Sequence, residues 1–230
     1  IAKLLNPNYR KQVPISYLYT GDDTQLISAT VSGAEVVKVK VGIESVDADV
    51  QRIRHVRGFI GADVSIRVDA NGAWTEEQAA EAIQRMEPLG VRSMEEPVRD
   101  RNLEAMARLR GRGIHIALDE SVRSLDELER IISLNAADAI VIKPMLIGTP
   151  LHVMAMMQRV DQAGLHIWVT TTIDAAVGRM MALQLAAAAS TTNLAHQRLQ
   201  HCWLKGLFSP TPTATAYTEL QFLAPTSCQL

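Results

Sequence analysis

Short apolar segments recur along the chain, and a stretch with helical periodicity follows most of them. The segments are rich in Val, Ile, Leu and Ala and lack strict alternation of apolar and polar positions, which is typical of parallel strands covered on both faces. We predict seven strands, over residues 13–19, 36–41, 64–68, 91–94, 114–118, 139–142 and 166–170.

Helix-start signals lie between these segments. Thr75 and Ser124 begin the sequences T-E-E-Q and S-L-D-E, which match a capping box ahead of apolar residues at helical spacing. Asp47 and Asp100 are expected to cap two further helices. Strands that alternate with helices indicate either a (β/α) barrel or a doubly wound sheet.

Charged residues close four consecutive strands at nearly even spacing. Asp69, Glu95, Asp119 and Lys143 follow one another at intervals of 26, 24 and 24 residues. In a parallel barrel the strand ends form one face, so three carboxylates and an ammonium group would converge there. An open sheet has a single switch-point crevice and does not gather four successive strand ends so readily. The spacing therefore favours an α/β fold with a TIM-type barrel of seven or eight strands.

The regular pattern does not cover the whole chain. Residues 1–12 are interpreted as a linker or the end of something missing, and residues 13–196 as the barrel; the resemblance described below implies that the first are a remnant of a capping domain and the second its catalytic domain. Residues 197–230 form an atypical tail in which Thr and Pro are frequent and no strand–helix unit is visible. We interpret the tail as either non-native sequence or a replacement for the last barrel unit.

Composition and charge argue against several kinds of partner and location for this protein. A net charge of −2 over 230 residues, without a basic run, argues against nucleic acid or an anionic membrane as a partner. The most apolar helical run, 180–189, is too short to span a bilayer. Cys202 and Cys228 form no disulfide framework, which favours a reducing, cytoplasmic location.

The three carboxylates suggest a metal site. A single acid after a strand is usually a helix cap, but three in register favour a shared ligand. Hard oxygen ligands suit Mg²⁺, with Mn²⁺ as a substitute, and no Cys or His joins them as a zinc site would require. Asn71 and Glu120 flank the predicted ligands and could orient them.

Three lysines form a second group of candidate functional residues. Lys38 and Lys40 lie two residues apart on a strand, so their side chains share one face. In a barrel interior, burial and mutual repulsion would lower a lysine pKa and produce a base near neutral pH; on an edge strand both would face water. Lys143 is interpreted as a site residue, with a Schiff-base lysine or a surface charge as alternatives.

A hydroxyl-rich segment, V-T-T-T-I-D-A-A-V-G, spans residues 169–178. Together with Asn71, we predict substrate contacts from Thr171, Thr172 and Ile173, since hydroxyl and backbone N–H donors at a helix start can bind an anionic group. Ordinary helix capping by Thr172 or Asp174 is the alternative.

These strings resemble the muconate-lactonizing-enzyme subgroup of the enolase superfamily. Its K-x-K, D-x-N, E-[EQ]-P and D-E-S strings and its strand-six lysine match, in order, Lys38 with Lys40, Asp69 with Asn71, Glu95, Asp119 and Lys143. The match covers roughly residues 8–196. Within the subgroup, R-V-D-A-N-G-A-W, I-V-I-K-P-M-L-I-G and T-T-T-I-D-A-A-V-G are most similar to o-succinylbenzoate synthase.

The resemblance implies a hydro-lyase of menaquinone biosynthesis that converts 2-succinyl-6-hydroxy-2,4-cyclohexadiene-1-carboxylate to o-succinylbenzoate. Asp69, Glu95 and Asp119 would hold Mg²⁺, which would stabilise an enediolate. Lys40 would abstract the proton α to the carboxylate of this small-molecule substrate, Lys143 would stabilise the enediolate, and Lys38 would lower the pKa of Lys40.

Two alternatives to the synthase stay open. One is an N-acylamino acid racemase, dipeptide epimerase or cycloisomerase, in which Lys40 and Lys143 act as opposed acid/base groups. The other is an inactive truncated barrel that binds metal without turnover, because the subgroup's capping domain and Gly-containing eighth strand are not recognised in this sequence. An exposed barrel face would then favour homo-oligomers.

Overall fold

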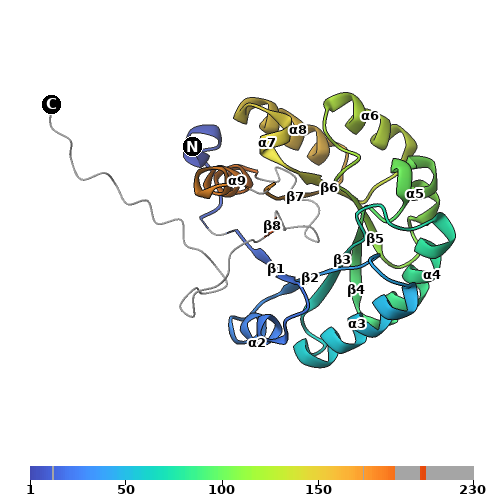
Figure 1. Cartoon of the computed structure of the whole chain (residues 1–230). Coiled ribbons are helices and arrows are strands. Elements are labelled where there is room, and N and C mark those ends of the chain that lie inside the picture. The colour runs from blue at the N-terminus through green and yellow to red at the C-terminus, as the bar shows by residue number, and fades with distance from the viewer. Residues whose placement is uncertain (12, 173, 190–202, 206–230) are drawn as a thin grey trace, which may run out of the picture.

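A curled sheet of parallel strands forms the centre of the protein, and helices cover its outer side (Figure 1). The computed structural model describes residues 1–11, 13–172, 174–189 and, as backbone alone, 203–205. Its first seven strands are β1 Ile15–Tyr19, β2 Val36–Lys40, β3 Ser65–Asp69, β4 Val91–Glu95, β5 His115–Leu118, β6 Ala139–Ile142 and β7 His166–Val169. Each pairs in parallel with the next, in chain order.

The sheet closes through a strand that the sequence pattern did not reveal. β8 (Trp203–Lys205) pairs its backbone with β7 on one side and β1 on the other, so the strand order runs around a barrel. The sequence pattern showed no strand–helix unit after residue 196, so this strand was not recognised, although replacement of the last barrel unit was one of the two interpretations of the tail. The remainder of the predicted tail lies outside the described residues, and the predicted domain boundaries stay predictions.

The helices after β1 alternate with the strands along the chain. They are α2 Asp23–Val31, α3 Val46–Ile60, α4 Glu76–Met86, α5 Leu103–Leu109, α6 Leu125–Leu134, α7 Pro144–Ile147, α8 Pro150–Gln162 and α9 Ala176–Ala188, with short 3₁₀ turns η1 Glu87–Leu89 and η2 Arg99–Arg101. Apolar residues at helical spacing form the buried side of α3, as Val50, Ile53 and Val56 illustrate, whereas α9 buries every residue from Ala182 to Ala188. Within the described residues, no helix is long and apolar enough to cross a membrane.

Helix starts follow the capping rules, with two corrections. Thr75 and Gln78 form the predicted reciprocal capping box of α4. Ser124 caps α6 by accepting from the Glu127 N–H, whereas the Glu127 carboxylate accepts from the Arg123 N–H, so only half of that box forms.

The corrections concern α5 and α3. Asn102, not Asp100, caps α5, because its side-chain oxygen lies three residues before the Ala105 N–H and accepts from it at 3.0 Å. Ser45 caps α3, and Asp47 lies in the first turn instead.

The first residues of the chain pack against the barrel wall. Helix α1 (Ala2–Leu5) lies beside α9 (Figure 1). The Ala2 N–H donates to Gln184 Oε1 at 3.0 Å, and Asn6 Nδ2 donates to the Ala188 carbonyl at 2.9 Å. Residues 1–11 thus contribute to the outer layer.

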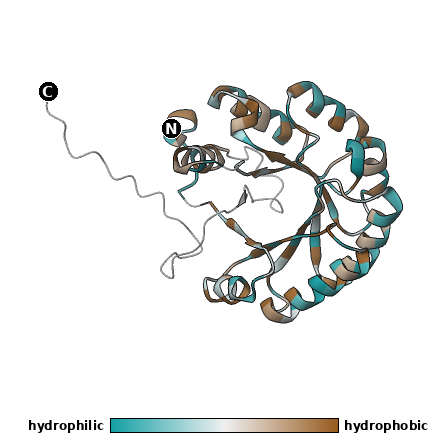
Figure 2. Cartoon of the chain, viewed as in Figure 1, coloured by the Kyte–Doolittle hydropathy of each residue, from teal (hydrophilic) through white to brown (hydrophobic). Residues whose placement is uncertain are grey.

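Buried apolar residues form two groups, and Figure 2 shows hydrophobic residues, in brown, along both the strands and the helices. The larger group lies between sheet and helices and includes Val37 and Val39 of β2. A smaller group, which includes Val36 and Trp168, lines the barrel interior. Because successive strand residues point to opposite faces, Lys38 and Lys40 share the side of Val36 and point into the barrel.

Candidate active site at the carboxyl ends of the strands

Three carboxylates gather at one end of the barrel. Asp69 and Glu95 are the last residues of β3 and β4 and are register partners, and Asp119 directly follows β5. All three are buried, with exposed fractions of 0%, 4% and 3%. The structure therefore brings the sequence-predicted acids to the same end of adjacent strands, where several negative charges require compensation.

Two lysines of β2 supply part of that compensation. Lys38 is 2% exposed, and its Nζ lies 2.7 Å from Asp69 Oδ2 and 2.5 Å from Glu95 Oε2. Lys40 Nζ lies 2.7 Å from the same Asp69 oxygen, but its side chain is 36% exposed and reaches the barrel mouth. β2 pairs on both sides, with β1 and β3, so the edge-strand alternative for these lysines was wrong.

Lys143 approaches from the far wall. It follows β6, and its Nζ lies 2.7 Å from Asp119 Oδ1, with the side chain 20% exposed. In the closed order, β6 stands four strands from β2 in either direction. Lys40 and Lys143 thus extend from opposite sides of the barrel mouth, and a purely surface role for Lys143 does not fit this contact.

Asp119 shows how crowded with negative charge the site is. Burial, and after it the neighbouring Glu95 charge, raise its pKa from 3.8 to about 7 against the opposing effect of the Lys143 ammonium. A cation placed among these acids would favour the ionised form of Asp119.

Asn71 contacts Asp69, and Glu120 contacts Asn71. The Asn71 N–H donates to Asp69 Oδ1 at 3.1 Å, and its side-chain oxygen accepts from Lys40 Nζ. Asn71 Nδ2 in turn donates to Glu120 Oε1 at 2.9 Å. This chain of contacts fixes the Lys40 amine beside Asp69.

Glu96 is a buried acid that the sequence reasoning missed. It is 1% exposed and accepts hydrogen bonds from the Asp119 N–H at 2.9 Å, the Ser121 N–H at 3.3 Å and the Ser121 hydroxyl. Burial raises its pKa, and the three donors oppose that shift. The second acid of the E-E-P string was the available signal.

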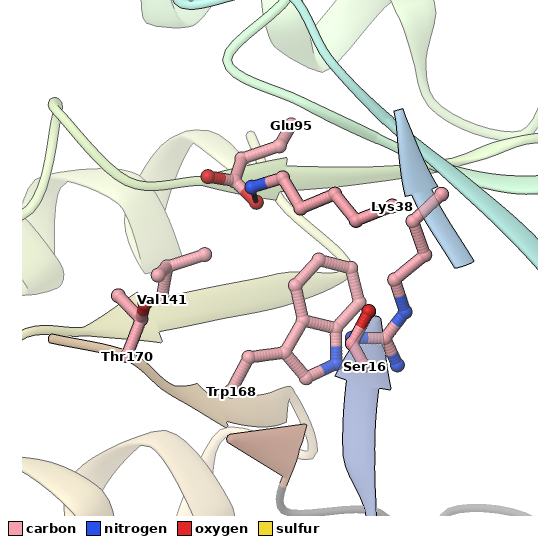
Figure 3. A pocket seen from close by; sticks show the side chains of 7 residues that line it. Ser16, Lys38, Glu95, Val141, Trp168 and Thr170 are labelled. Carbon is pink, nitrogen blue, oxygen red and sulfur yellow. Dashed lines mark hydrogen bonds and ion pairs between the residues drawn. The ribbon is translucent and has the colours of Figure 1, made fainter. Parts of the chain in front are cut away.

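A small cavity lies inside the barrel beneath the carboxylates (Figure 3). Its lining consists of Ser16, Lys38, Arg67, Glu95, Val141, Trp168 and Thr170. The Arg67 guanidinium carbon lies 3.9 Å from the centroid of the Trp168 ring, and burial lowers the Arg67 pKa to about 9 while the Glu95 charge opposes that shift. Arg67 stands two residues before Asp69 on β3, so strand alternation was the signal that could have placed it on the same side.

The threonines of the hydroxyl-rich segment lie at different depths in the barrel mouth. Thr170 is 1% exposed and lines the cavity, whereas Thr171 and Thr172 are partly exposed after β7. The Thr172 hydroxyl contacts Asp174, and Ala175 is the N-cap of α9, so the capping alternative was wrong. Ile173 lies outside the described residues.

The predicted metal ligands fit Mg²⁺ by chemistry but are not assembled around a common point. Within the part of the chain that the structure describes, no three His, Cys, Asp or Glu side chains are grouped closely enough to hold a metal ion. Lys38 contacts Asp69 and Glu95, and Lys143 contacts Asp119. Three buried carboxylates on neighbouring strands form a donor set of the type that Mg²⁺ prefers. Binding a metal would require these side chains to turn from the lysines toward each other.

Comparisons with known proteins show which family the chain is similar to. The family described as enolase C-terminal domain-like matches residues 24–221. A chloromuconate cycloisomerase of Cupriavidus necator is 31% identical over 194 residues, which cover 81% of this chain and 52% of that protein. An N-succinyl-L-Arg/Lys racemase of Bacillus cereus is 27% identical over 193 residues, with 81% and 52% covered. The chain spans about half the length of the curated relatives it matches.

Solved structures share the same fold. A substrate-liganded L-Ala-D/L-Glu epimerase from Bacillus subtilis matches with a TM-score of 0.78 and 24% identity, over 89% of this chain and 56% of that chain. A dipeptide epimerase from Cytophaga hutchinsonii, complexed with Mg and the dipeptide D-Ala-L-Val, matches with a TM-score of 0.74 and 27% identity, over 89% and 55%.

Proposed function

The chain belongs to the family of enolase C-terminal domain-like proteins, and on this premise we propose that it forms the catalytic barrel of an enzyme that moves the proton α to a substrate carboxylate. Among reactions of this kind, we propose epimerisation or racemisation of an N-acylated amino acid or a dipeptide. Relatives named as racemases and epimerases support this choice over the dehydratase suggested by the sequence.

The observation that carries the proposal is the placement of two lysines on opposed strands. Lys40 is the last residue of β2, and Lys143 directly follows β6 on the opposite side of the barrel. Both side chains are partly exposed at the barrel mouth. Inversion at a carbon requires a group that removes a proton from one face and a group that returns one to the other face. The two lysines would supply these two groups for a substrate held between them.

Polar and charged neighbours contact the two lysines. The Asp69 carboxylate and the Asn71 side-chain oxygen contact the Lys40 amine, and Asp119 contacts that of Lys143, so a cation that takes these carboxylates would release both amines toward the substrate. Lys38 is too buried to reach a substrate at the mouth, so its role is to balance the charges of Asp69 and Glu95. Glu120 orients Asn71 through the 2.9 Å hydrogen bond.

Asp69, Glu95 and Asp119 would hold Mg²⁺, or Mn²⁺ in its place. When bound, the metal would supply positive charge for the substrate carboxylate and for the negative charge that develops on it. Thr171 and Thr172, with Ile173, are proposed to contact the remainder of the substrate.

The dehydratase predicted from the sequence is the alternative that an assay can separate, because it needs only Lys40 as a proton carrier. The 230-residue chain is incubated with Mg²⁺ in deuterated water with three kinds of substrate: N-succinyl amino acids and dipeptides, the cyclohexadiene carboxylate, and cis,cis-muconate. We expect inversion with incorporation of deuterium for the first kind, and no inversion with Lys40→Ala.

Other outcomes have clear meanings. Formation of o-succinylbenzoate or of a lactone without inversion contradicts epimerisation and supports the synthase or a cycloisomerase. A folded chain that exchanges no α-proton in any substrate contradicts the proposed function and supports the inactive barrel.

A further inference from the structure

Glu96 connects three loops at the mouth of the barrel. Its backbone N–H donates to the Ala117 carbonyl at 2.8 Å, and its own carbonyl accepts from the Gly72 N–H at 2.6 Å. Its carboxylate accepts from the backbone N–H groups of Asp119 and Ser121 and from the Ser121 hydroxyl. One residue thus joins the segments that follow β3, β4 and β5.

The backbone of Glu96 has the conformation that this role needs. Glu95 points into the barrel, so regular strand alternation would direct Glu96 toward the helices. Instead, its φ of +40° lies in the left-handed region, which is uncommon for a residue other than Gly. Such a conformation persists where the surrounding contacts determine it, and the five hydrogen bonds of Glu96 are those contacts.

These three segments are the ones that carry the candidate carboxylates. Asp69 precedes the segment that Gly72 anchors, Glu95 directly precedes Glu96, and Asp119 is itself bound by the Glu96 carboxylate through its N–H. The Ala70 N–H adds a further link by donating to the Glu95 carbonyl at 3.0 Å. The Glu96 backbone therefore links the segment after β3 to β5, and its buried side chain holds Asp119 in position relative to the other two acids.

We infer that Glu96 is a positioning residue: its carboxylate holds residues 119–121 against the end of β4, so that Asp119 stands beside Asp69 and Glu95 for a shared cation. Glu96 acts through Asp119 and not on the substrate. The inferred effect on the cation rests on the proposed function, whereas the effect on residues 119–121 rests on the contacts alone.

Two substitutions at Glu96 separate shape from charge. In Glu96→Gln, the amide oxygen can accept from the two backbone N–H groups, and the amide nitrogen can donate to the Ser121 hydroxyl. In Glu96→Ala all three acceptor contacts are lost, and the N–H groups of Asp119 and Ser121 are left without this partner. Gln should therefore rescue what Ala removes.

The chain offers a matched control at the other end of the same strand. Asp138 Oδ2 accepts from the Ile116 N–H at 2.8 Å, so it also fastens β5 through a side-chain carboxylate, but away from the mouth. Asp138→Ala should loosen β5 at Ile116 and leave residues 119–121 and the cation unaffected.

The experiment combines amide hydrogen exchange, measured by NMR, with Mn²⁺ binding, measured by electron paramagnetic resonance of the free ion. For Glu96→Ala we expect the Asp119 and Ser121 amides to exchange about tenfold faster or more, and Mn²⁺ to bind about 10- to 100-fold more weakly. Glu96→Gln should stay close to the unmodified protein in both readouts. If Glu96→Ala does not fold, Ser121→Ala should show the same changes by smaller factors.

Several results would overturn the inference. They are unchanged exchange at Asp119 and Ser121 in folded Glu96→Ala, absence of rescue by Gln, and equal weakening of Mn²⁺ binding by Asp138→Ala. If the unmodified protein does not bind Mn²⁺, the proposed function fails, and the exchange measurement still decides whether Glu96 positions residues 119–121.

Discussion

Replacing Lys38 by methionine tests the charge balance beneath the barrel mouth. The side chains are similar in length, so Lys38→Met removes the ammonium group while largely preserving the packing of the stem. Two buried carboxylates, Asp69 and Glu95, then lose a cation that lies 2.7 Å and 2.5 Å from them. The variant should be less stable, because the charges stay out of water and repel each other.

The geometry allows an estimate of the loss. At an effective dielectric constant of about 20, each contact near 2.7 Å contributes roughly 6 kcal/mol of attraction before desolvation is counted. Removal of one partner from a buried ion pair costs about 3–5 kcal/mol net. Lys40 remains beside Asp69, so we expect the lower end, about 3 kcal/mol, which corresponds to a fall in Tm of about 6–12 °C for a domain of this size.

Urea denaturation followed by circular dichroism, at neutral pH with a chelator present, measures this loss. Lys40→Met is the matched control: its side chain is 36% exposed, and solvent screening limits the expected loss to about 1 kcal/mol or less. A loss below about 1 kcal/mol for Lys38→Met, or an equal loss for Lys40→Met, would refute the reasoning.

Three further predictions test other parts of the fold by the same denaturation assay. Thr75→Ala removes the hydroxyl that accepts from the Gln78 N–H, which is one half of the α4 capping box, and should cost about 1 kcal/mol, which Thr75→Ser should restore. Gly42→Ala should cost more than Gly61→Ala, since both have positive φ but only at Gly42 would a new Cβ meet another atom, the Ala73 Cβ at 2.5 Å; equal losses would count against this packing. Burial raises the pKa of Asp49 above 3.8, against the Gly42 N–H and Arg52, so the folded state binds its proton more tightly and stability falls as pH rises from 3.8 through the raised value. The unfolding free energy of Asp49→Asn relative to the unmodified protein should therefore increase from about pH 4 to about pH 7.5, and a flat or falling difference would contradict the assignment.

Periodicity predicted the strands well because each is short, apolar and bounded by turns. β6 lies at the predicted residues 139–142, and β2 differs from its prediction by one residue. β8 was missed because three residues carry no period, and its pairing with β1 joins distant parts of the chain. The cap of α5 was misplaced for a local reason: Asp100 and Asn102 are both good capping residues, and only the backbone path decides between them.

Sequence alone placed the candidate acids and lysines at the strand ends but could not give their partners. The K-V-K alternation correctly put Lys38 and Lys40 on one face. That Lys38 contacts two acids, and Lys40 only one of them, depends on the depth of each side chain in the barrel. Glu96 escaped prediction because its left-handed backbone reverses the side that alternation assigns to it.

The most direct test of the two-lysine arrangement is exchange of the α-proton with deuterated water, measured by NMR separately for each enantiomer of an N-succinyl amino acid in the presence of Mg²⁺. We predict that Lys40→Ala abolishes exchange from one enantiomer while retaining it from the other, and that Lys143→Ala shows the opposite preference, because the two amines extend from opposed strands. Loss of exchange from both enantiomers in Lys40→Ala, with none lost in Lys143→Ala, would contradict the proposal and leave a single base.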